Sequence, residues 1–272
     1  MRWFKMTARV REKDAFLLWL SEHESRGVWE VDESTLVAYG LSPFPPPPPE
    51  YVTEWYQEEE EGEDWERRFR ESFTTVWIGG DITVRPPWEA PSGAPFDIVI
   101  YPAFAFGTGH HPTTVLCLRM IRKYFQEGMA FLDVGTGSGV LAFLALKMRA
   151  SSVAALDCDP LAIAEFQRNA GLNGIPLEVV DLRLGSIDAI SGTFDCIAAN
   201  VSLHFHLEHL GDLVARLREG GYLILSGFER DDFPLLAERA KHFPLGLVEV
   251  VEDTPWVAVV YTLCYDRAKR GE

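Results

Sequence analysis

Two glycine-rich stretches hold the residues of this sequence that are best suited to chemistry. The stretch "AFAFGTGHHPTTVLCL", residues 103–118, combines a Gly-Thr-Gly turn with two histidines and a Thr-Thr pair. The stretch "FLDVGTGSGVLAFLAL", residues 131–146, places a second glycine turn between a predicted strand and a predicted helix. Closely spaced glycines remove Cβ atoms and let a ligand lie against the backbone. Because doubly wound sheets bind cofactors where a strand passes into a helix, the second turn predicts a cofactor site.

The spacing of the second turn distinguishes between classes of cofactor. Its glycines are Gly135, Gly137 and Gly139, in the pattern G-x-G-x-G. A dinucleotide-binding turn reads G-x-G-x-x-G, with Gly or Ala at the last position, and this chain has Val140 there. We therefore expect a cofactor that contains adenosine but no pyrophosphate, so that no phosphate has to bind at the N-terminus of the helix. The same mismatch argues against an NAD-binding oxidoreductase, which is the alternative class of enzyme.

Three polar side chains end the predicted strands around this turn. Asp157 ends the next strand, about 20 residues after the first glycine, where a carboxylate accepts both hydroxyl protons of a ribose. Asp133 ends the strand before the turn, and it either fixes the loop or reaches the amino group of the cofactor. Asn200 ends the strand "FDCIAAN", where its amide oxygen can accept a hydrogen bond from an incoming amine. In the alternative structural interpretation, all three are strand-end or turn residues.

The charge balance limits the kind of partner. The chain of 272 residues has 41 acidic and 25 basic residues, which gives a net charge of −16. Surfaces that bind nucleic acid are usually basic, so no direct contact with nucleic acid is expected. The negative charge either keeps the protein soluble or attracts a basic protein partner.

The apolar runs and the cysteines predict a cytoplasmic protein. No apolar run approaches the roughly 20 residues that a membrane helix needs, and the N-terminus lacks the apolar segment and cleavage site of a signal peptide. We therefore expect no contact with a membrane. The four cysteines, Cys117, Cys158, Cys196 and Cys264, stand apart in the sequence. This spacing fits neither a disulfide framework nor a zinc site, and no metal is expected.

The order of predicted elements indicates two domains. Residues 1–62 contain a strand, a helix and two further strands, which predicts a small α+β domain. Residues 63–97 are expected to link it to the second domain. Over residues 98–272 strands alternate with helices, which predicts an α/β domain with a mostly parallel sheet. The last two predicted strands have no helix between them, so we expect an antiparallel pair at the edge of that sheet.

A run of five prolines, Pro45–Pro49, interrupts the first domain. Proline lacks an amide hydrogen and has a fixed φ, so the run excludes helix and interior strand and favours polyproline II. It is either a stiff surface loop or a ligand for an SH3-type domain, and the first is the commoner use of such runs.

Taken together, the motifs resemble the ribosomal protein L11 methyltransferase family. The family pattern A-F-G-T-G-x-H-x-T-T is matched by "AFGTGHHPTT", residues 105–114, at every specified position. The agreement continues through "LDVGTGSGVLA", Asp157 in "LDCD" and Asn200 in "AAN", and it covers about residues 64–228. The segment after Asn200, "VSLHFHLEH", departs from the family pattern in being rich in aromatic residues and histidine.

This resemblance implies a Rossmann-like class I methyltransferase domain, with a mostly parallel seven-stranded sheet and an antiparallel edge strand. The implied cofactor is S-adenosyl-L-methionine, and the implied acceptors are lysine and N-terminal amines of ribosomal protein L11, held by the small N-terminal domain. The residues implied to contact the cofactor or close its pocket are Phe106, Thr113, Thr114, Gly135, Asp157 and Asn200. Gly137 and Asp133 are further cofactor candidates from the glycine turn itself. The first glycine loop is then expected to fold over the cofactor as a lid, with Phe106 against it.

Methyl transfer to an amine defines the remaining roles. A lysine ammonium has no lone pair, so the site must receive the amine neutral. Desolvation and a neighbouring sulfonium charge both lower the pKa of such an amine, and Asn200 is the residue expected to orient its nitrogen. His111 is either a direct base or a structural, hydrogen-bonding residue of the lid. The histidines of "HFHLEH", residues 204–209, are expected on the surface or in an acceptor groove rather than on a metal.

Other functions stay open at this point. A diverged protein-lysine methyltransferase would use the same site on a different acceptor, and a non-catalytic binding module would keep the fold without turnover. Calorimetry with S-adenosylmethionine and with NAD separates the methyltransferase from the oxidoreductase. Cofactor binding without methyl transfer would favour the binding module.

Overall fold

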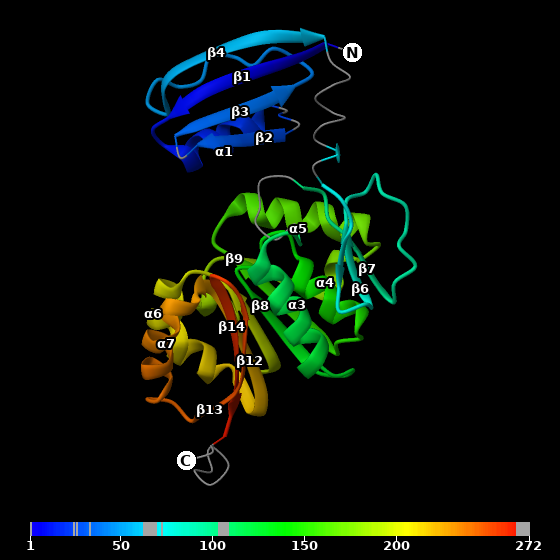
Figure 1. The fold of residues 1–272 in the computed structure, drawn as a ribbon, viewed down its shortest axis with the longest axis vertical. Coiled ribbons are helices and arrows are strands. Elements are labelled where there is room, and N and C mark those ends of the chain that lie inside the picture. The colour runs from blue at the N-terminus through cyan, green and yellow to red at the C-terminus, as the bar shows by residue number, and fades with distance from the viewer. Residues whose placement is uncertain are drawn as a thin grey trace. The chain divides into compact units, whose positions relative to one another are not determined.

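A computed structural model describes residues 2–23, 25, 27–32, 34–61, 70–71, 73–102 and 109–264 (Figure 1). The chain divides into two compact units: the N-terminal unit contains Met1–Thr74 and the short segment Pro102–Phe104, and the C-terminal unit contains Thr75–Tyr101 and Ala105–Glu272. The predicted division into residues 1–62, 63–97 and 98–272 stays a prediction as a whole. Residues 75–97 of its linker lie in the C-terminal unit.

The N-terminal unit is a four-stranded antiparallel sheet with one helix against it. The strands follow the order β2-β3-β1-β4. The elements are β1 (Arg2–Val10), α1 (Lys13–Glu22), β2 (Gly27–Asp32), β3 (Thr35–Gly40) and β4 (Val52–Glu61). Helix α1 buries Phe16, Trp19 and Leu20, whose spacing places them on one side of the helix. Phe44 and Pro47 are also buried, so the proline run packs one side onto this unit, as a stiff surface loop does.

The C-terminal unit contains a seven-stranded sheet in the order β10-β9-β8-β11-β12-β14-β13. The strands are β8 (Ala130–Val134), β9 (Ser152–Asp157), β10 (Val180–Leu184), β11 (Phe194–Asn200), β12 (Leu217–Glu229), β13 (Leu245–Asp253) and β14 (Trp256–Leu263). The pairs from β10 to β12 are parallel, whereas β14 is antiparallel to both of its neighbours. The predicted fold class is confirmed. The reversed strand lies one position in from the edge, which β13 occupies.

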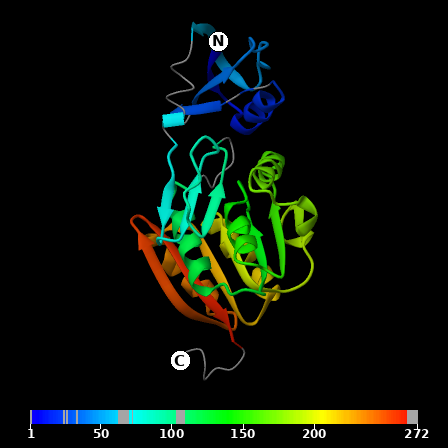
Figure 2. The same ribbon diagram turned by 90° about the vertical axis from the view of Figure 1, so that its right-hand side faces the viewer.

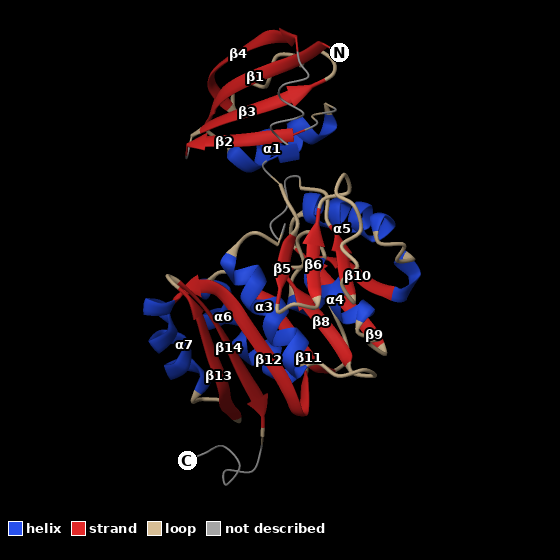
Figure 3. Cartoon of the chain, turned by 45° about the vertical axis from the view of Figure 1, so that its right-hand side comes forward, coloured by secondary structure: helices blue, strands red, loops and turns tan. Residues whose placement is uncertain are grey.

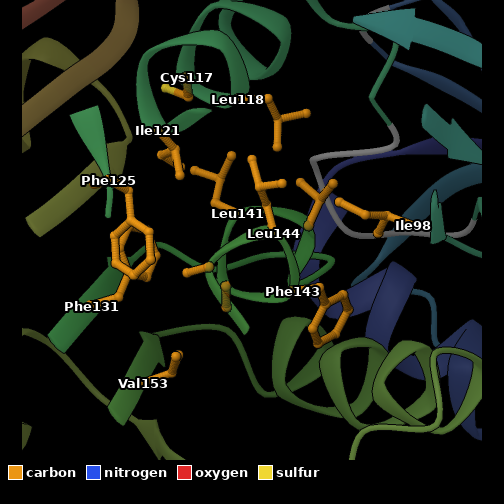
Figure 4. Close-up of a cluster of buried hydrophobic side chains, with 14 of the residues drawn as sticks. Ile98, Cys117, Leu118, Ile121, Phe125, Phe131, Leu141, Phe143, Leu144 and Val153 are labelled. Carbon is orange, nitrogen blue, oxygen red and sulfur yellow. The ribbon is translucent and has the colours of Figure 1, made fainter. Parts of the chain in front are cut away.

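Helices cover both faces of this sheet (Figures 2 and 3). They are α3 (Pro112–Tyr124), α4 (Val140–Lys147), α5 (Pro160–Leu172), α6 (Leu203–Ala215) and α7 (Phe233–Ala240). One buried apolar cluster contains side chains of α3, α4 and α5, and a second contains those of α6 and α7. In Figure 4, Leu118 and Ile121 of α3 meet Leu141 and Leu144 of α4 within the first cluster. Among the described residues, no helix has both the length and the apolar character needed to cross a bilayer.

A separate three-stranded sheet completes the first of these faces. Its strands are β5 (Val76–Ile78), β6 (Ile82–Arg85) and β7 (Phe96–Val99). Strand β6 pairs antiparallel with β5 and parallel with β7. Ile78, Ile82, Val84 and Ile98 from these strands are buried in the same cluster as α3 and α4. The small sheet is therefore held by apolar packing against the helices that surround the predicted site.

The strand order brings the predicted site residues to one edge of the large sheet. Strands β9, β8 and β11 are neighbours, and Asp157, Gly135 and Asn200 stand at or just after their carboxyl ends. Helices α3 and α5 both begin at this edge, each with a polar capping residue followed by proline, His111-Pro112 and Asp159-Pro160. Ligands of such sheets bind at the carboxyl ends of the strands, so the predicted residues converge where a cofactor is expected.

Candidate cofactor and acceptor site

The glycine turn after β8 has a backbone that requires glycine. Gly135, Gly137 and Gly139 have φ values of 71°, 50° and 87°, all in the left-handed region. A Cβ on Gly139 would lie 2.5 Å from Phe143 Cζ and 2.8 Å from Phe166 Cδ2. Both rings are fully buried, so they have no room to move away. At Gly139 both the conformation and the packing therefore exclude a side chain.

Backbone amides tie this turn to β9. The amides of Gly135 and Thr136 both donate to the carbonyl oxygen of Leu156, each at 2.9 Å. The amide of Gly137 donates to Oδ2 of Asp157 at 2.9 Å. The turn and the predicted ribose-binding carboxylate thus form one hydrogen-bonded unit.

Asp157 keeps hydrogen-bonding capacity for a ligand. Its Oδ1 accepts from the amide of Asp159 at 3.0 Å, in addition to the bond at Oδ2. Each carboxylate oxygen has a second lone pair, and the side chain is only partly buried. The arrangement fits an acceptor of two ribose hydroxyl protons, which stays a prediction.

Asp133 lies beneath the turn and is fully buried. Its Oδ2 accepts from Thr136 Oγ1 at 2.8 Å and from the amide of Ala142 at 3.1 Å. Of the two roles open from the sequence, these contacts support fixing the loop. Burial raises the pKa of the carboxyl to about 7 and the charge of Asp157 adds to this, against the lowering by the two hydrogen bonds. Its Oδ1 is buried without a hydrogen-bond partner among the described residues.

Asn200 and Thr114 form the second part of the site. Asn200 Nδ2 donates to Thr114 Oγ1 at 3.5 Å, which joins the end of β11 to the first turn of α3. Thr114 is 1% exposed. Asn200 Oδ1 is buried and has no partner within the described part of the chain. Since a buried acceptor without a donor costs free energy, this oxygen is the atom of the site best prepared for a hydrogen bond from a ligand.

His111 caps helix α3, next to the same site. Its Nδ1 lies 2.7 Å from Thr113 Oγ1 and accepts from the Thr113 amide at 3.3 Å. Burial lowers the pKa of the imidazole, which favours the neutral ring. These contacts support the structural alternative for His111. Thr113 is fully buried beneath it.

Trp256 is a residue of this edge that the sequence analysis did not identify. Its ring meets the His111 ring edge-on, with centroids 4.7 Å apart. Trp256 begins β14, and because β14 runs against its neighbours, the start of this strand lies at the carboxyl edge of the parallel strands. The only signal in the sequence was a tryptophan at the start of a strand in the predicted antiparallel pair.

The histidines after β11 have different surroundings, with the Nε2 atoms of His204 and His209 3.6 and 3.9 Å from Glu208 Oε2. His206 is fully buried, which corrects the expectation that it lies on the surface or in an acceptor groove. Its Nε2 lies 2.8 Å from the Ser226 carbonyl oxygen, and burial lowers its pKa to about 4, so the ring is neutral. His204 is exposed, and His209 Nδ1 lies 3.1 Å from Asp212 Oδ2. No group of three or more His, Cys, Asp and Glu suited to a metal ion occurs in the part of the chain that the structure describes.

Phe106 lies outside the described residues, as do its neighbours from 103 to 108. The predicted lid and its contact with the cofactor therefore stay predictions. The described end of this loop is fixed at Gly109, where φ is 85° and a Cβ would lie 2.7 Å from Val84 Cβ.

Comparison with known proteins agrees with this geometry. Residues 48–263 match the model of the family described as "Ribosomal protein L11 methyltransferase (PrmA)". A ribosomal protein L11 methyltransferase of Geobacter sulfurreducens is 36% identical over 226 residues, which cover 82% of this chain and 72% of that protein. The corresponding protein of Porphyromonas gingivalis is 36% identical over 223 residues, 81% of this chain and 75% of the relative.

A solved structure agrees as well. The crystal structure of a ribosomal protein L11 methylase from Lactobacillus delbrueckii subsp. bulgaricus superposes with a TM-score of 0.66 and 27% sequence identity. The match covers 71% of this chain and all of the other. The resemblance inferred from the motifs is thereby confirmed, and the chain belongs to the ribosomal protein L11 methyltransferase family.

Proposed function

We propose that the protein transfers methyl groups from S-adenosyl-L-methionine to lysine or N-terminal amines of ribosomal protein L11. The names of the family and of the relatives support the reaction and the acceptor. The observation that carries the proposal is the buried, unpartnered amide oxygen of Asn200, at the same sheet edge as the glycine turn and Asp157.

The residues at the turn suit this cofactor better than a dinucleotide. A pyrophosphate needs free amides at the N-terminus of the helix. Here the amide of Gly139 donates to the Thr136 carbonyl oxygen at 2.9 Å, and that of Ala142 donates to the carboxylate of Asp133 at 3.1 Å. An internal acid thus occupies the positive end of α4. This leaves fewer amides for a pyrophosphate and disfavours the NAD-binding alternative.

The residues of this chain would then divide the work. Asp157 would bind the ribose and the glycine turn would accommodate the amino-acid part and the adenosine against the backbone. When bound, the cofactor supplies an electrophilic methyl group on a sulfonium. Asn200 Oδ1 would accept an N–H of the neutral acceptor amine and so direct the nitrogen lone pair along the line of attack. His111, held as the cap of α3, needs no role as a base, because the amine can lose its proton to water before it binds.

The acceptor and the location belong to the same proposal. A net charge of −16 favours the approach of a basic protein, as L11 is expected to be. The N-terminal unit is the part proposed to hold it. A ribosomal protein as acceptor supports action in the cytoplasm.

One experiment tests the acceptor directly. The protein is incubated with labelled S-adenosylmethionine and an extract from cells that lack it, and the labelled band is identified. We expect the label on L11. A label on another protein would reject L11 and favour a diverged protein methyltransferase, whereas binding of the cofactor without any labelled protein would favour a non-catalytic module.

The cofactor site has its own test. Asp157→Ala removes the charged hydrogen-bond acceptor, so affinity for S-adenosylmethionine in calorimetry should fall about 10- to 100-fold. Asp159→Asn is the control, because it stands two residues away at the cap of α5 and asparagine caps helices equally well. Unchanged affinity in the Asp157 variant would mean that the ribose binds elsewhere.

A further inference from the structure

One side chain of α5 connects two backbone segments that are distant in the sequence. Asn169 is 1% exposed. Its Nδ2 donates to the Ser138 carbonyl oxygen at 3.0 Å, and its Oδ1 accepts from the Tyr101 amide at 3.0 Å. Both functional atoms of the amide are therefore used, one toward the glycine turn and one toward the segment that follows β7.

The Ser138 carbonyl lies between the last two glycines of the turn. Its neighbours are Gly137 and Gly139, with φ values of 50° and 87°. Helix α4 does not use this oxygen in its own ladder, because the first helical bond runs from the Phe143 amide to the Gly139 carbonyl oxygen at 2.9 Å. A buried carbonyl oxygen needs a donor, and Asn169 of α5 supplies one. The turn is thus held from the sheet by Asp157 and from α5 by Asn169.

A second asparagine contacts the same segment after β7 but does not contact the glycine turn. Asn173, which caps the C-terminus of α5 four residues further on, accepts from the Val99 amide at 2.9 Å and donates to the Val99 carbonyl oxygen at 2.7 Å. Residues two apart in an extended segment direct their amides to the same side and match residues four apart on a helix. Asn169 and Asn173 thus each accept one amide of the segment from Val99 to Tyr101, and Asn173 also donates to the Asn169 carbonyl oxygen at 2.8 Å. The difference is that the amide nitrogen of Asn169 reaches the glycine turn.

We propose that Asn169 is a positioning residue for the cofactor: it fixes the peptide between Ser138 and Gly139 in the orientation that leaves the turn open to S-adenosylmethionine. This inference rests on the proposed function and assigns a role that the glycine pattern alone does not contain. Asparagine suits the position because its planar amide offers an acceptor and a donor on two atoms bonded to the same carbon. Aspartate keeps the acceptor and loses the donor.

The test compares two matched substitutions, Asn169→Asp and Asn173→Asp. Each keeps an acceptor for the backbone amide that it now receives, from Tyr101 or from Val99, and removes the amide donor. Asn169→Asp should lower stability in urea unfolding more than Asn173→Asp, because position 169 is the more deeply buried of the two. Only Asn169→Asp removes the donor from the glycine turn. We expect its KM for S-adenosylmethionine to rise roughly tenfold with kcat changed less than about twofold, and the KM of Asn173→Asp to stay within about twofold of the parent protein.

The alanine pair, Asn169→Ala and Asn173→Ala, repeats the comparison without a new charge, and it serves where an aspartate prevents folding. Calorimetric binding of S-adenosylhomocysteine gives the same comparison without turnover. Equal effects of the two positions on cofactor binding, or no effect at position 169, would overturn the positioning role. Failure of the unmodified protein to bind either compound would instead reject the proposed function.

Discussion

The two units of the molecule differ in what they bury. The N-terminal unit packs an apolar core around Met6, Phe16 and Leu20, and its ion pairs, such as Lys5–Glu58 and Arg9–Glu54, are partly or largely exposed. Among the described residues, the buried polar and charged side chains all belong to the C-terminal unit. They are Thr83, Thr113, Thr114, Asp133, Thr136, Ser138, Glu165, Asn169, His206 and Ser226.

This difference indicates which residues stabilise the fold and which are kept for the predicted site. A buried polar group without a full set of partners costs about 1–3 kcal/mol, and exposed ion pairs contribute little in either direction. Half of these ten residues lie at the start of α3, near the end of β8 or on the turn after it, namely Thr113, Thr114, Asp133, Thr136 and Ser138. Both units contain buried polar atoms without a partner among the described residues, such as Thr7 Oγ1 in the N-terminal unit, but those at the predicted site are Asp133 Oδ1 and Asn200 Oδ1, so part of this energetic cost falls on the site itself.

The largest effect that the comparison predicts is at the glycine turn. Gly139→Ala should lower the free energy of unfolding by about 3 kcal/mol or more and abolish cofactor binding, because strain and overpacking add at one position. Gly128→Ala is the matched control, since φ is 88° there against 87° at Gly139 and a Cβ would meet nothing within 4 Å. It should cost only about 1 kcal/mol. Equal losses in urea unfolding would show that the Phe143 and Phe166 rings do not restrict the turn.

A core substitution in the other unit should leave the site intact. Leu20→Ala in α1 empties a fully buried position and should cost about 2–5 kcal/mol of stability. Leu18→Ala, in the same helix but 43% exposed, should change stability by about 0.5 kcal/mol or less. In neither variant should calorimetry detect more than a small change in affinity for S-adenosylmethionine. A large loss of affinity in the Leu20 variant would contradict the separation of the two units.

The smallest predicted effect concerns the buried acid. Burial raises the pKa of Asp133 from 3.8 to about 7. Between these values the folded protein holds a proton that the unfolded chain has lost, so this group makes the free energy of unfolding fall as pH rises through that window. Asp133→Asn cannot ionise and should be more stable than the parent protein by about 1 kcal/mol at about pH 8, with a smaller difference at about pH 5.

Urea unfolding at the two pH values measures the difference in stability between the parent protein and Asp133→Asn. Asn keeps an oxygen for the bonds from Thr136 and Ala142, so the loop should stay in place. If the free energy of unfolding of the parent protein instead rises relative to that of the variant as pH rises, Asp133 is stabilised as a carboxylate. The energetic cost assigned to its burial is then wrong.

Much of the C-terminal fold was predictable from local sequence. A strand, a glycine turn and a helix are adjacent in the chain, and the acid of the next strand follows at a fixed interval, so Gly135, Gly137 and Asp157 needed no tertiary information. Asn200 could be found for the same reason, because it ends a strand. The turn at Gly79 and Gly80 between β5 and β6 was also visible, since two glycines separated two β-rich runs.

The remaining features depend on contacts between distant segments. His206 can be buried because its Nε2 has a hydrogen-bond partner, the Ser226 carbonyl oxygen. The sequence around His206, a run rich in histidine, did not indicate this partner. The contact of Trp256 with His111 follows from a reversed strand at the far end of the sheet. The two bonds of Asn169 join segments 31 and 68 residues away. Hydrophobic periodicity placed Asn169 on a helix and contained nothing about its partners.

The position of β14 has a consequence for how the protein matures. This strand fills the gap between β12 and β13 and is hydrogen-bonded to both. Until β14 has been synthesised, β13 has no strand to pair with in this sheet. Strand β12 then has an unpaired edge, and such an edge can pair with another chain and start aggregation. A nascent or truncated chain without β14 therefore lacks two strands rather than one.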